Sequence, residues 1–325
     1  MRKKYFRNKV AVITGAASGI GREFALQLAK MGTHLVLSDI NMEGLEKVQD
    51  EIKEINGNVK VLIAECDVTK QLDTKKLARM AIETMGEIDF LFSNAGIAVG
   101  GLFETIGIAQ WRRIIDINVY GMIHLVKAFI DKFLEQGFGH IIVTGSIASN
   151  LGIGGLEPYN TAKFANAGFC EALYGEYHKK GLDVSIVCPF PLKTNMMEGV
   201  GIGIDPELLQ GINPQALKTT IEEGKKTYWE TFTKKQSIFK GYAGGFSIPR
   251  AVKRFLKKIR KKKLYIFERR YGRMLQFLRG LWPGAYKKFI EAMGKRHTEL
   301  LENTFYTSLE KARNKTLQLE KEQME

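Results

Sequence analysis

The stretch KVAVITGAASGIG, residues 9–21, decides the fold. A continuous apolar run ends at Thr14, and glycines follow at positions 15, 19 and 21. An apolar strand that passes through a glycine turn into a helix places free backbone N–H groups and the positive end of the helix dipole together. Glycine allows both the tight turn and a close approach of the backbone to a pyrophosphate. The stretch therefore predicts the dinucleotide-binding edge of a parallel sheet.

Strand-like and helix-like runs alternate along the chain after this turn. Apolar strand runs follow at 34–38, 59–64, 88–92, 140–144, 184–188 and 264–267. Helical spacing covers 20–31, 42–55, 70–85, 108–116, 119–135, 158–180 and 249–260. Continuous apolar strands between amphipathic helices are typical of a parallel sheet that is covered on both faces. The sequence therefore predicts an α/β fold, a doubly wound parallel sheet of the Rossmann type in three α/β/α layers.

No internal repeat or low-complexity linker divides the chain. We expect one domain over residues 1–268, which begins with a short basic tail and includes inserted helices and loops at about 194–245 near the substrate. Residues 269–325 are predicted to form a basic helical C-terminal extension.

Composition limits the class of protein. Of the 325 residues, 45% are apolar and 26% are charged, as in an ordinary soluble globular protein. No apolar run is long enough for a membrane-spanning helix. The three cysteines are an odd number without a CxxC motif, so they indicate a reducing compartment rather than a disulfide framework or a zinc site. We expect a cytoplasmic protein that binds no metal, with association with a membrane as an alternative left open.

An acidic residue at the end of the second predicted strand is expected to lie beside the glycine turn. Asp39 ends the second strand, 18 residues after Gly21. A carboxylate at this place accepts hydrogen bonds from a ribose diol and repels a 2′-phosphate. Neither lysine nor arginine occupies position 17, 18 or 40. The sequence therefore favours NAD, with NADP the less favoured alternative.

Tyr159 and Lys163 lie four residues apart on a predicted helix, so both side chains share one face. A nearby ammonium group favours the phenolate and would bring the tyrosine toward proton exchange with an alcohol at neutral pH. Ser146 follows the fifth strand and could hold the substrate oxygen. A tyrosine and a lysine at this spacing are common on surface helices, so the pair alone indicates little.

Together these residues resemble the short-chain dehydrogenase/reductase family over roughly residues 9–195. The matching motifs occur in the family's order and are Thr14-Gly-x-x-x-Gly-Ile-Gly21, Asp67, Asn94-Ala-Gly96, Asn118, Ser146 and Tyr159-x-x-x-Lys163. The resemblance implies that Tyr159 is the general acid/base and that Ser146 orients the substrate oxygen. It implies that Lys163 binds the nicotinamide ribose and lowers the pKa of Tyr159, and that Asn118 holds a water.

The resemblance also implies the residues that contact the cofactor. These are Gly15, Ser18, Gly19, Ile20, Gly21, Asp39, Asp67, Val68, Asn94, Ala95, Gly96, Tyr159, Lys163, Pro189, Leu192 and Thr194. Asn94 would support the sheet beside the cofactor, and Ser146 and Tyr159 would contact the substrate. One position departs from the family, because Phe190 stands where a glycine usually follows the proline. Phenylalanine adopts a positive φ only at a cost, so its ring could instead form an apolar wall of the substrate pocket.

Apolar residues flank the expected chemistry. They are Leu151, Ile153 and Leu156 before Tyr159, and Met196, Met197, Val200 and Ile202 after the sixth strand. Such a lining suits a bulky apolar alcohol or carbonyl compound of the steroid, retinoid or fatty type. The same residues could equally belong to the core or to a lid.

The basic character of the chain is local. The net charge is +14, and residues 250–296 contain 17 Lys or Arg but only two acids, so the rest of the chain is close to neutral. Within this segment an apolar stripe recurs at helical spacing and consists of Tyr271, Met274, Leu275, Leu278, Leu281 and Trp282. Residues 269–296 could contact an anionic membrane surface, or the stripe could pack on the sheet domain or on a partner subunit. No nucleic-acid motif accompanies the basic segment, so we expect no nucleic acid as a partner.

The leading hypothesis is an NAD-dependent oxidoreductase that acts on an alcohol or carbonyl carbon and uses Tyr159 as its general acid/base. The alternative is a non-catalytic NAD-binding regulatory protein or a peripheral membrane protein. The resemblance implies an oligomer, and we expect a homodimer.

Overall fold

The computed structural model describes residues 5–190, 201–202, 206–235, 247–268 and 271–322. Seven strands form one sheet, in which every neighbouring pair is parallel. In spatial order they are β3 (Val61–Glu65), β2 (His34–Asp39), β1 (Val10–Thr14), β4 (Phe90–Ser93), β6 (Gly139–Thr144), β7 (Leu182–Cys188) and β9 (Tyr265–Phe267). The strand order reverses between β1 and β4, and the crevice at such a point is where these sheets bind ligands. The predicted doubly wound parallel sheet is confirmed.

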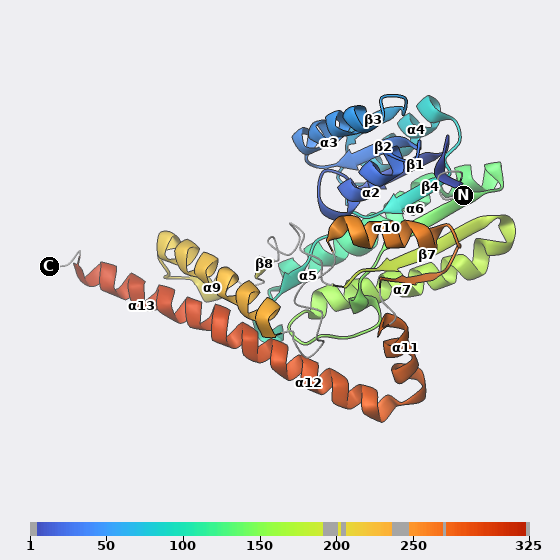
Figure 1. Ribbon diagram of the computed structural model, residues 1–325. Coiled ribbons are helices and arrows are strands. Elements are labelled where there is room, and N and C mark those ends of the chain that lie inside the picture. The colour runs from blue at the N-terminus through green and yellow to red at the C-terminus, as the bar shows by residue number, and fades with distance from the viewer. Residues whose placement is uncertain (1–4, 191–200, 203–205, 236–246, 269–270, 323–325) are drawn as a thin grey trace.

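Helices cover both faces of the sheet (Figure 1). The helices on one face are α2 (Gly19–Ala29), α3 (Met42–Ile55) and α10 (Ile248–Ile259). Those on the other face are α4 (Gln71–Met85), α6 (Gly121–Gln136) and α7 (Glu157–Tyr177). This arrangement confirms the three layers, and the observed ends differ from the predicted ones by a few residues, as helix and strand ends commonly do.

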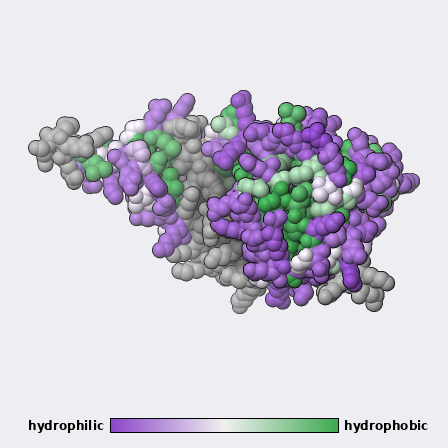
Figure 2. All heavy atoms as spheres, turned by 90° about the horizontal axis from the view of Figure 1, so that it is seen from above, coloured by the Kyte–Doolittle hydropathy of each residue, from purple (hydrophilic) through white to green (hydrophobic). Residues whose placement is uncertain are grey.

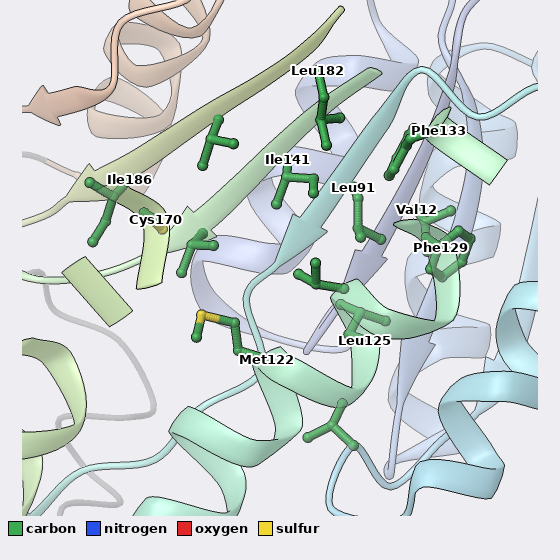
Figure 3. Close-up of a cluster of buried hydrophobic side chains, with 14 of the residues drawn as sticks. Val12, Leu91, Met122, Leu125, Phe129, Phe133, Ile141, Cys170, Leu182 and Ile186 are labelled. Carbon is green, nitrogen blue, oxygen red and sulfur yellow. The ribbon is translucent and has the colours of Figure 1, made fainter. Parts of the chain in front are cut away.

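The core on the α6 face draws on all four central strands. Side chains from β1, β4, β6 and β7 meet Met122, Leu125, Phe129 and Phe133 of α6, as Figure 3 shows. The other face of the same strands is buried under α2, α3 and α10, so every residue of β1, β4, β6 and β7 is buried. Phe6 is 2% exposed and joins this second cluster, so the expected N-terminal tail contributes to the core from residue 6.

The two helices predicted over 108–116 and 119–135 form one continuous helical segment. α5 (Ile108–Ile115) passes through a π-helical turn, Asp116–Tyr120, directly into α6. A π turn inserts a residue into the helix and often marks a functional site. Asn118 lies inside this turn.

The C-terminal region is helical, as predicted. It comprises α11 (Tyr271–Leu281), α12 (Pro283–Leu301) and α13 (Thr307–Glu322). α12 and α13 run away from the sheet as a long rod, and α9 (Pro214–Lys235) packs along α13 (Figure 1). Leu275 joins the core, which confirms that part of the apolar stripe packs on the sheet domain.

The surface seen from above the view of Figure 1 is largely hydrophilic, around a smaller hydrophobic area (Figure 2). Figure 1 shows the edge strand β3 near the top of its view, and residues 61–64 of this strand are only partly buried. Among the described residues, no helix has the length and apolar character that crossing a bilayer requires.

Candidate active site

The glycine turn forms a cradle between β1 and α2. Gly15 and Gly19 have positive φ values of 64° and 55°, which favour glycine. A Cβ atom on Gly15 would lie 2.9 Å from the Cα of Ala95, and one on Gly21 would lie 2.1 Å from the carbonyl oxygen of Gly15. Ser18 precedes α2 and makes no side-chain cap hydrogen bond, so the first N–H groups of the helix are not capped by it. The cradle and the helix N-terminus fit the pyrophosphate of a dinucleotide.

Asp39 lies at the end of β2 and faces this turn. Its Oδ2 accepts a hydrogen bond from the Ala17 N–H at 3.1 Å, and its Oδ1 accepts one from the Asn41 N–H at 3.1 Å. Arg22, in the first turn of α2, donates to Glu51 at 3.1 Å and forms an ion pair with it. A carboxylate is therefore fixed beside the cradle, while this arginine is engaged on α3.

Asn94 joins the ends of three strands. Its Nδ2 donates to the carbonyl oxygens of Thr14 at 3.1 Å and Gly15 at 3.2 Å, and its Oδ1 accepts from the Thr144 hydroxyl at 3.0 Å. The Thr14 hydroxyl accepts from the N–H groups of Asn94 and Ala95. Asn94 therefore links three strand ends, and the two threonines are partners that the sequence did not indicate. Their only signal in the sequence is that each ends a strand.

Asp67 and Val68 follow β3 and have different surroundings. The Oδ1 of Asp67 accepts from the Thr69 N–H at 3.0 Å and from the Thr69 hydroxyl at 2.7 Å, so this carboxylate fixes its own turn. Val68 is buried, and a Cβ on Gly121 would lie 2.6 Å from its Cγ2. The turn is thereby held against the start of α6.

Ser146, Tyr159 and Lys163 come together at the end of β6. The Oγ of Ser146 accepts from the Ala148 N–H at 3.1 Å and so begins the 3₁₀ turn Ile147–Ser149. The Ser146 hydroxyl lies near enough to the Tyr159 phenol to lower its pKa, in opposition to burial. The Lys163 Nζ donates to the Thr144 carbonyl oxygen at 2.9 Å and lies 5.5 Å from the centre of the Tyr159 ring. These three predicted residues therefore form one cluster on α7 and the β6 end.

Asn118 closes the cluster from the π turn. Its Nδ2 donates to the carbonyl oxygens of Ile97 at 3.0 Å and Ile114 at 3.1 Å. Its buried Oδ1 has no hydrogen-bond partner among the described residues. A Cβ on Gly96 would lie 2.6 Å from this oxygen and 3.7 Å from the Lys163 Nζ, so both groups border Gly96. A buried acceptor without a protein partner suits an ordered water, which is the role expected for Asn118.

Burial has the largest effect on the pKa values of Tyr159 and Lys163. Burial raises the pKa of Tyr159, against the opposing effect of the nearby Ser146 hydroxyl. Burial also lowers the pKa of Lys163, to about 8. We expected Lys163 to lower the pKa of Tyr159, but the net direction in this structure is upward, because the loss of water around the phenol outweighs the opposing effect of Ser146. The Lys163 amine donates to the Thr144 carbonyl oxygen.

The end of β7 is tied to the Ser146 turn. The carbonyl oxygen of Pro189 accepts from the Ile147 N–H at 2.9 Å. Phe190 is partly buried and packs against the core cluster on the α6 face. Leu192 and Thr194, expected to contact the cofactor, lie outside the described residues, as do Met196, Met197 and Val200.

The C-terminal helices α11 and α12 lie on the loop between Ser146 and Tyr159, a contact that the sequence did not indicate. The Gln276 Nε2 of α11 donates to the Asn150 Oδ1 at 2.9 Å, and the Tyr286 hydroxyl of α12 donates to the Asn150 carbonyl oxygen at 3.1 Å. The buried His297 of α12 hydrogen-bonds through Nδ1 to the Gly154 carbonyl oxygen. Leu151 of this loop is 3% exposed and belongs to the core. The C-terminal helices therefore border the catalytic cluster.

Comparison with known proteins agrees with this geometry. A sequence profile described as short chain dehydrogenase matches residues 9–203. Human epidermal retinol dehydrogenase 2 is 34% identical over 224 residues, which cover 68% of this chain and 72% of that protein. Cyclohexanol dehydrogenase of Acinetobacter sp. is 38% identical over 194 residues, 59% of this chain and 76% of that protein.

A solved structure extends the comparison. The crystal structure of a short chain dehydrogenase/reductase from Burkholderia phymatum in complex with NAD superposes with a TM-score of 0.69 at 26% identity, and covers 85% of this chain and 94% of that one. The profile spans more than half of the chain, and its range contains the cradle and the catalytic cluster described above. The chain therefore belongs to the short-chain dehydrogenase family and is an oxidoreductase.

Proposed function

We propose that this oxidoreductase transfers a hydride between NAD(H) and a bulky apolar secondary alcohol or ketone, or an aldehyde. The observation that carries the proposal is the cluster of Ser146, Tyr159 and the buried Lys163 at the end of β6, where Lys163 Nζ bonds to the Thr144 carbonyl oxygen and lies 5.5 Å from the Tyr159 ring centre. Two hydroxyl groups that meet at the carboxyl edge of the sheet can hold one substrate oxygen between them.

The chain's own residues handle the oxygen and its proton. When bound, the nicotinamide ring accepts or donates the hydride at the substrate carbon. In alcohol oxidation Tyr159 takes the hydroxyl proton as its own phenol proton leaves toward Lys163, while Ser146 holds the substrate oxygen that becomes the carbonyl. In the reverse direction Tyr159 returns this proton. Lys163, with a water on Asn118, provides the route by which the proton reaches solvent.

The choice of NAD rests on Asp39. Its carboxylate is held beside the cradle by the Ala17 N–H, where it would meet the ribose that carries a 2′-phosphate in NADP. The pairing of Arg22 with Glu51 removes one cation that could bind such a phosphate. The NAD-bound structural relative is consistent with this choice.

The substrate class and the setting are further parts of the proposal. The relatives named for retinol and cyclohexanol support an apolar alcohol with a ring. All three cysteines are free and buried, which suits a reducing compartment, and we place the chain in the cytoplasm as a homodimer with a peripheral membrane contact through residues 269–296.

A nicotinamide absorbance assay tests the proposal. Purified protein is supplied with NAD or NADP and with retinoid, steroid, cyclic and fatty alcohols. We expect turnover with NAD that falls by about 10²- to 10⁴-fold in Tyr159→Phe. Tyr174→Phe on the same helix is the matched control, because Tyr174 stacks on His178 outside the cluster. NADH binding without turnover on any substrate would favour a regulatory NAD-binding protein instead.

A further inference from the structure

One face of α11 exposes large apolar side chains. Met274, Phe277 and Leu281 are 46%, 58% and 66% exposed, and Trp282, directly after the helix, is 66% exposed. Their spacing of three and four residues places the first three in one stripe. We call these four residues the α11 surface. By contrast, α4, α6 and α13 each expose a single large apolar side chain among the described residues.

The opposite face of α11 fixes this helix on the body. Leu275 is 6% exposed in the core, and Gln276 donates to Asn150. The Arg279 guanidinium lies 5.0 Å from the centre of the Phe164 ring. At the corner with α12, the Trp282 N–H donates to the Leu278 carbonyl oxygen at 2.9 Å. The α11 surface is therefore held outward by a folded support.

The charges beside the α11 surface have one sign. Arg273 and Lys288 are exposed next to it in the chain, and residues 269–290 contain no Asp or Glu. An apolar strip with tryptophan at its end and basic residues at its margin matches the interface of an anionic bilayer, where apolar side chains enter the acyl boundary and cations meet the headgroups.

We propose that the α11 surface docks this protein on the anionic face of a lipid bilayer. The attachment is peripheral, because α11 is 11 residues long and a membrane-spanning helix needs about 20. A second copy of the chain is a poorer occupant. A two-fold contact through this surface would bring Arg273 and Lys288 close to their own copies, and like charges at an interface are costly. Nucleic acid is also a poorer occupant, because the centre of the surface is aliphatic and aromatic rather than basic.

Docking in this way would serve the proposed reaction. α11 contacts Asn150, four residues after Ser146, so the loop that carries the catalytic serine would lie close to the bilayer. A lipid-dissolved alcohol could then enter without crossing water. This purpose rests on the proposed function, whereas the docking itself is independent of catalysis.

Flotation with lipid vesicles tests the inference. The full chain is mixed with vesicles of phosphatidylcholine alone or with added phosphatidylserine, at low and high salt. We expect binding to the phosphatidylserine vesicles that weakens with salt, and a loss of affinity of about tenfold or more in Phe277→Ser/Leu281→Ser. The matched control is Leu208→Ser/Leu317→Ser, which removes two exposed leucines from another part of the chain. NADH fluorescence shows that each variant retains its folded cradle.

Each outcome decides the matter. Failure of the wild type to bind the anionic vesicles, or equal loss in both double variants, would overturn the proposal. So would an oligomer in solution that Phe277→Ser/Leu281→Ser dissociates while vesicle binding is absent, since the occupant would then be a second copy. Vesicle binding in a protein that turns over no alcohol would reject the proposed function and leave the docking surface standing.

Discussion

At the scale of a single residue, Asp39 supports the glycine turn and, in the proposed function, selects the cofactor. Its carboxylate accepts the Ala17 N–H and so supports the glycine turn, and its charge would repel a 2′-phosphate. In Asp39→Asn the amide oxygen can still accept from Ala17, but the negative charge is gone. We expect the preference for NAD over NADP to fall by about tenfold, which corresponds to about 1.4 kcal/mol. Binding of both cofactors is measured by fluorescence titration, and an unchanged ratio would contradict this role of the charge.

Lys163 illustrates the cost of placing a cation inside the site. Its side chain is 3% exposed, and burial lowers its pKa from 10.5 to about 8. Between these two values the unfolded chain binds more protons than the folded one, so this group makes folding more favourable as the pH rises through that window. Below pH 8 the buried cation destabilises the fold.

Comparison with Lys163→Met isolates this effect, because the other titrating groups are shared. We expect the free energy of unfolding of the wild type to gain about 2 kcal/mol relative to the variant between pH 7 and pH 10. Urea unfolding at the two pH values measures the difference. A difference that is independent of pH would mean that Lys163 keeps its ordinary pKa in the folded protein.

At the scale of elements, one side chain links β1, β4 and β6. Asn94 makes three hydrogen bonds to the ends of the neighbouring strands, through Thr14, Gly15 and Thr144. We expect Asn94→Ala to lower the free energy of unfolding by about 2–3 kcal/mol, because it leaves buried polar groups unpaired. Urea unfolding without cofactor measures the loss. Asn58→Ala, at an exposed position, should change stability little.

The strands and the cradle could be predicted because their signals are local. An apolar run of five residues is buried on both faces wherever it enters a parallel sheet, and glycines that need positive φ are visible in the sequence. The π turn at Asn118 gave no such signal, because the periodicity on either side of it reads as two separate helices. The pKa of Tyr159 also escaped prediction, since it depends on how much water the folded site excludes.

At the scale of the whole molecule, the C-terminal helices pack on the loop between Ser146 and Tyr159. Their apolar stripe indicated an amphipathic helix, but its partners lie more than a hundred residues away in the chain, so spacing alone could not identify them. Asn150 bonds to Gln276 and Tyr286, and the Tyr306 hydroxyl accepts from the Leu102 N–H at 3.2 Å. The observed contacts make the C-terminal extension part of the catalytic body near Ser146, whereas the rod beyond it packs mainly on α9.

Gly155 lies where the loop before Tyr159 packs tightly against α12 of the C-terminal extension. This residue has a φ of 79°, and a Cβ on it would lie 2.3 Å from the Leu301 Cδ1 and 2.9 Å from the His297 Nδ1. We therefore expect Gly155→Ala to push α12 away from the loop, to lower the free energy of unfolding by about 1–3 kcal/mol and to raise KM for the alcohol. Affinity for NADH should remain unchanged, because the cradle lies elsewhere on the sheet edge. Gly152→Ala in the same loop is the matched control, since its Cβ would meet nothing within 4 Å and its φ is not positive. Equal effects of the two substitutions on KM would mean that the loop alone, rather than its contact with α12, shapes the substrate site.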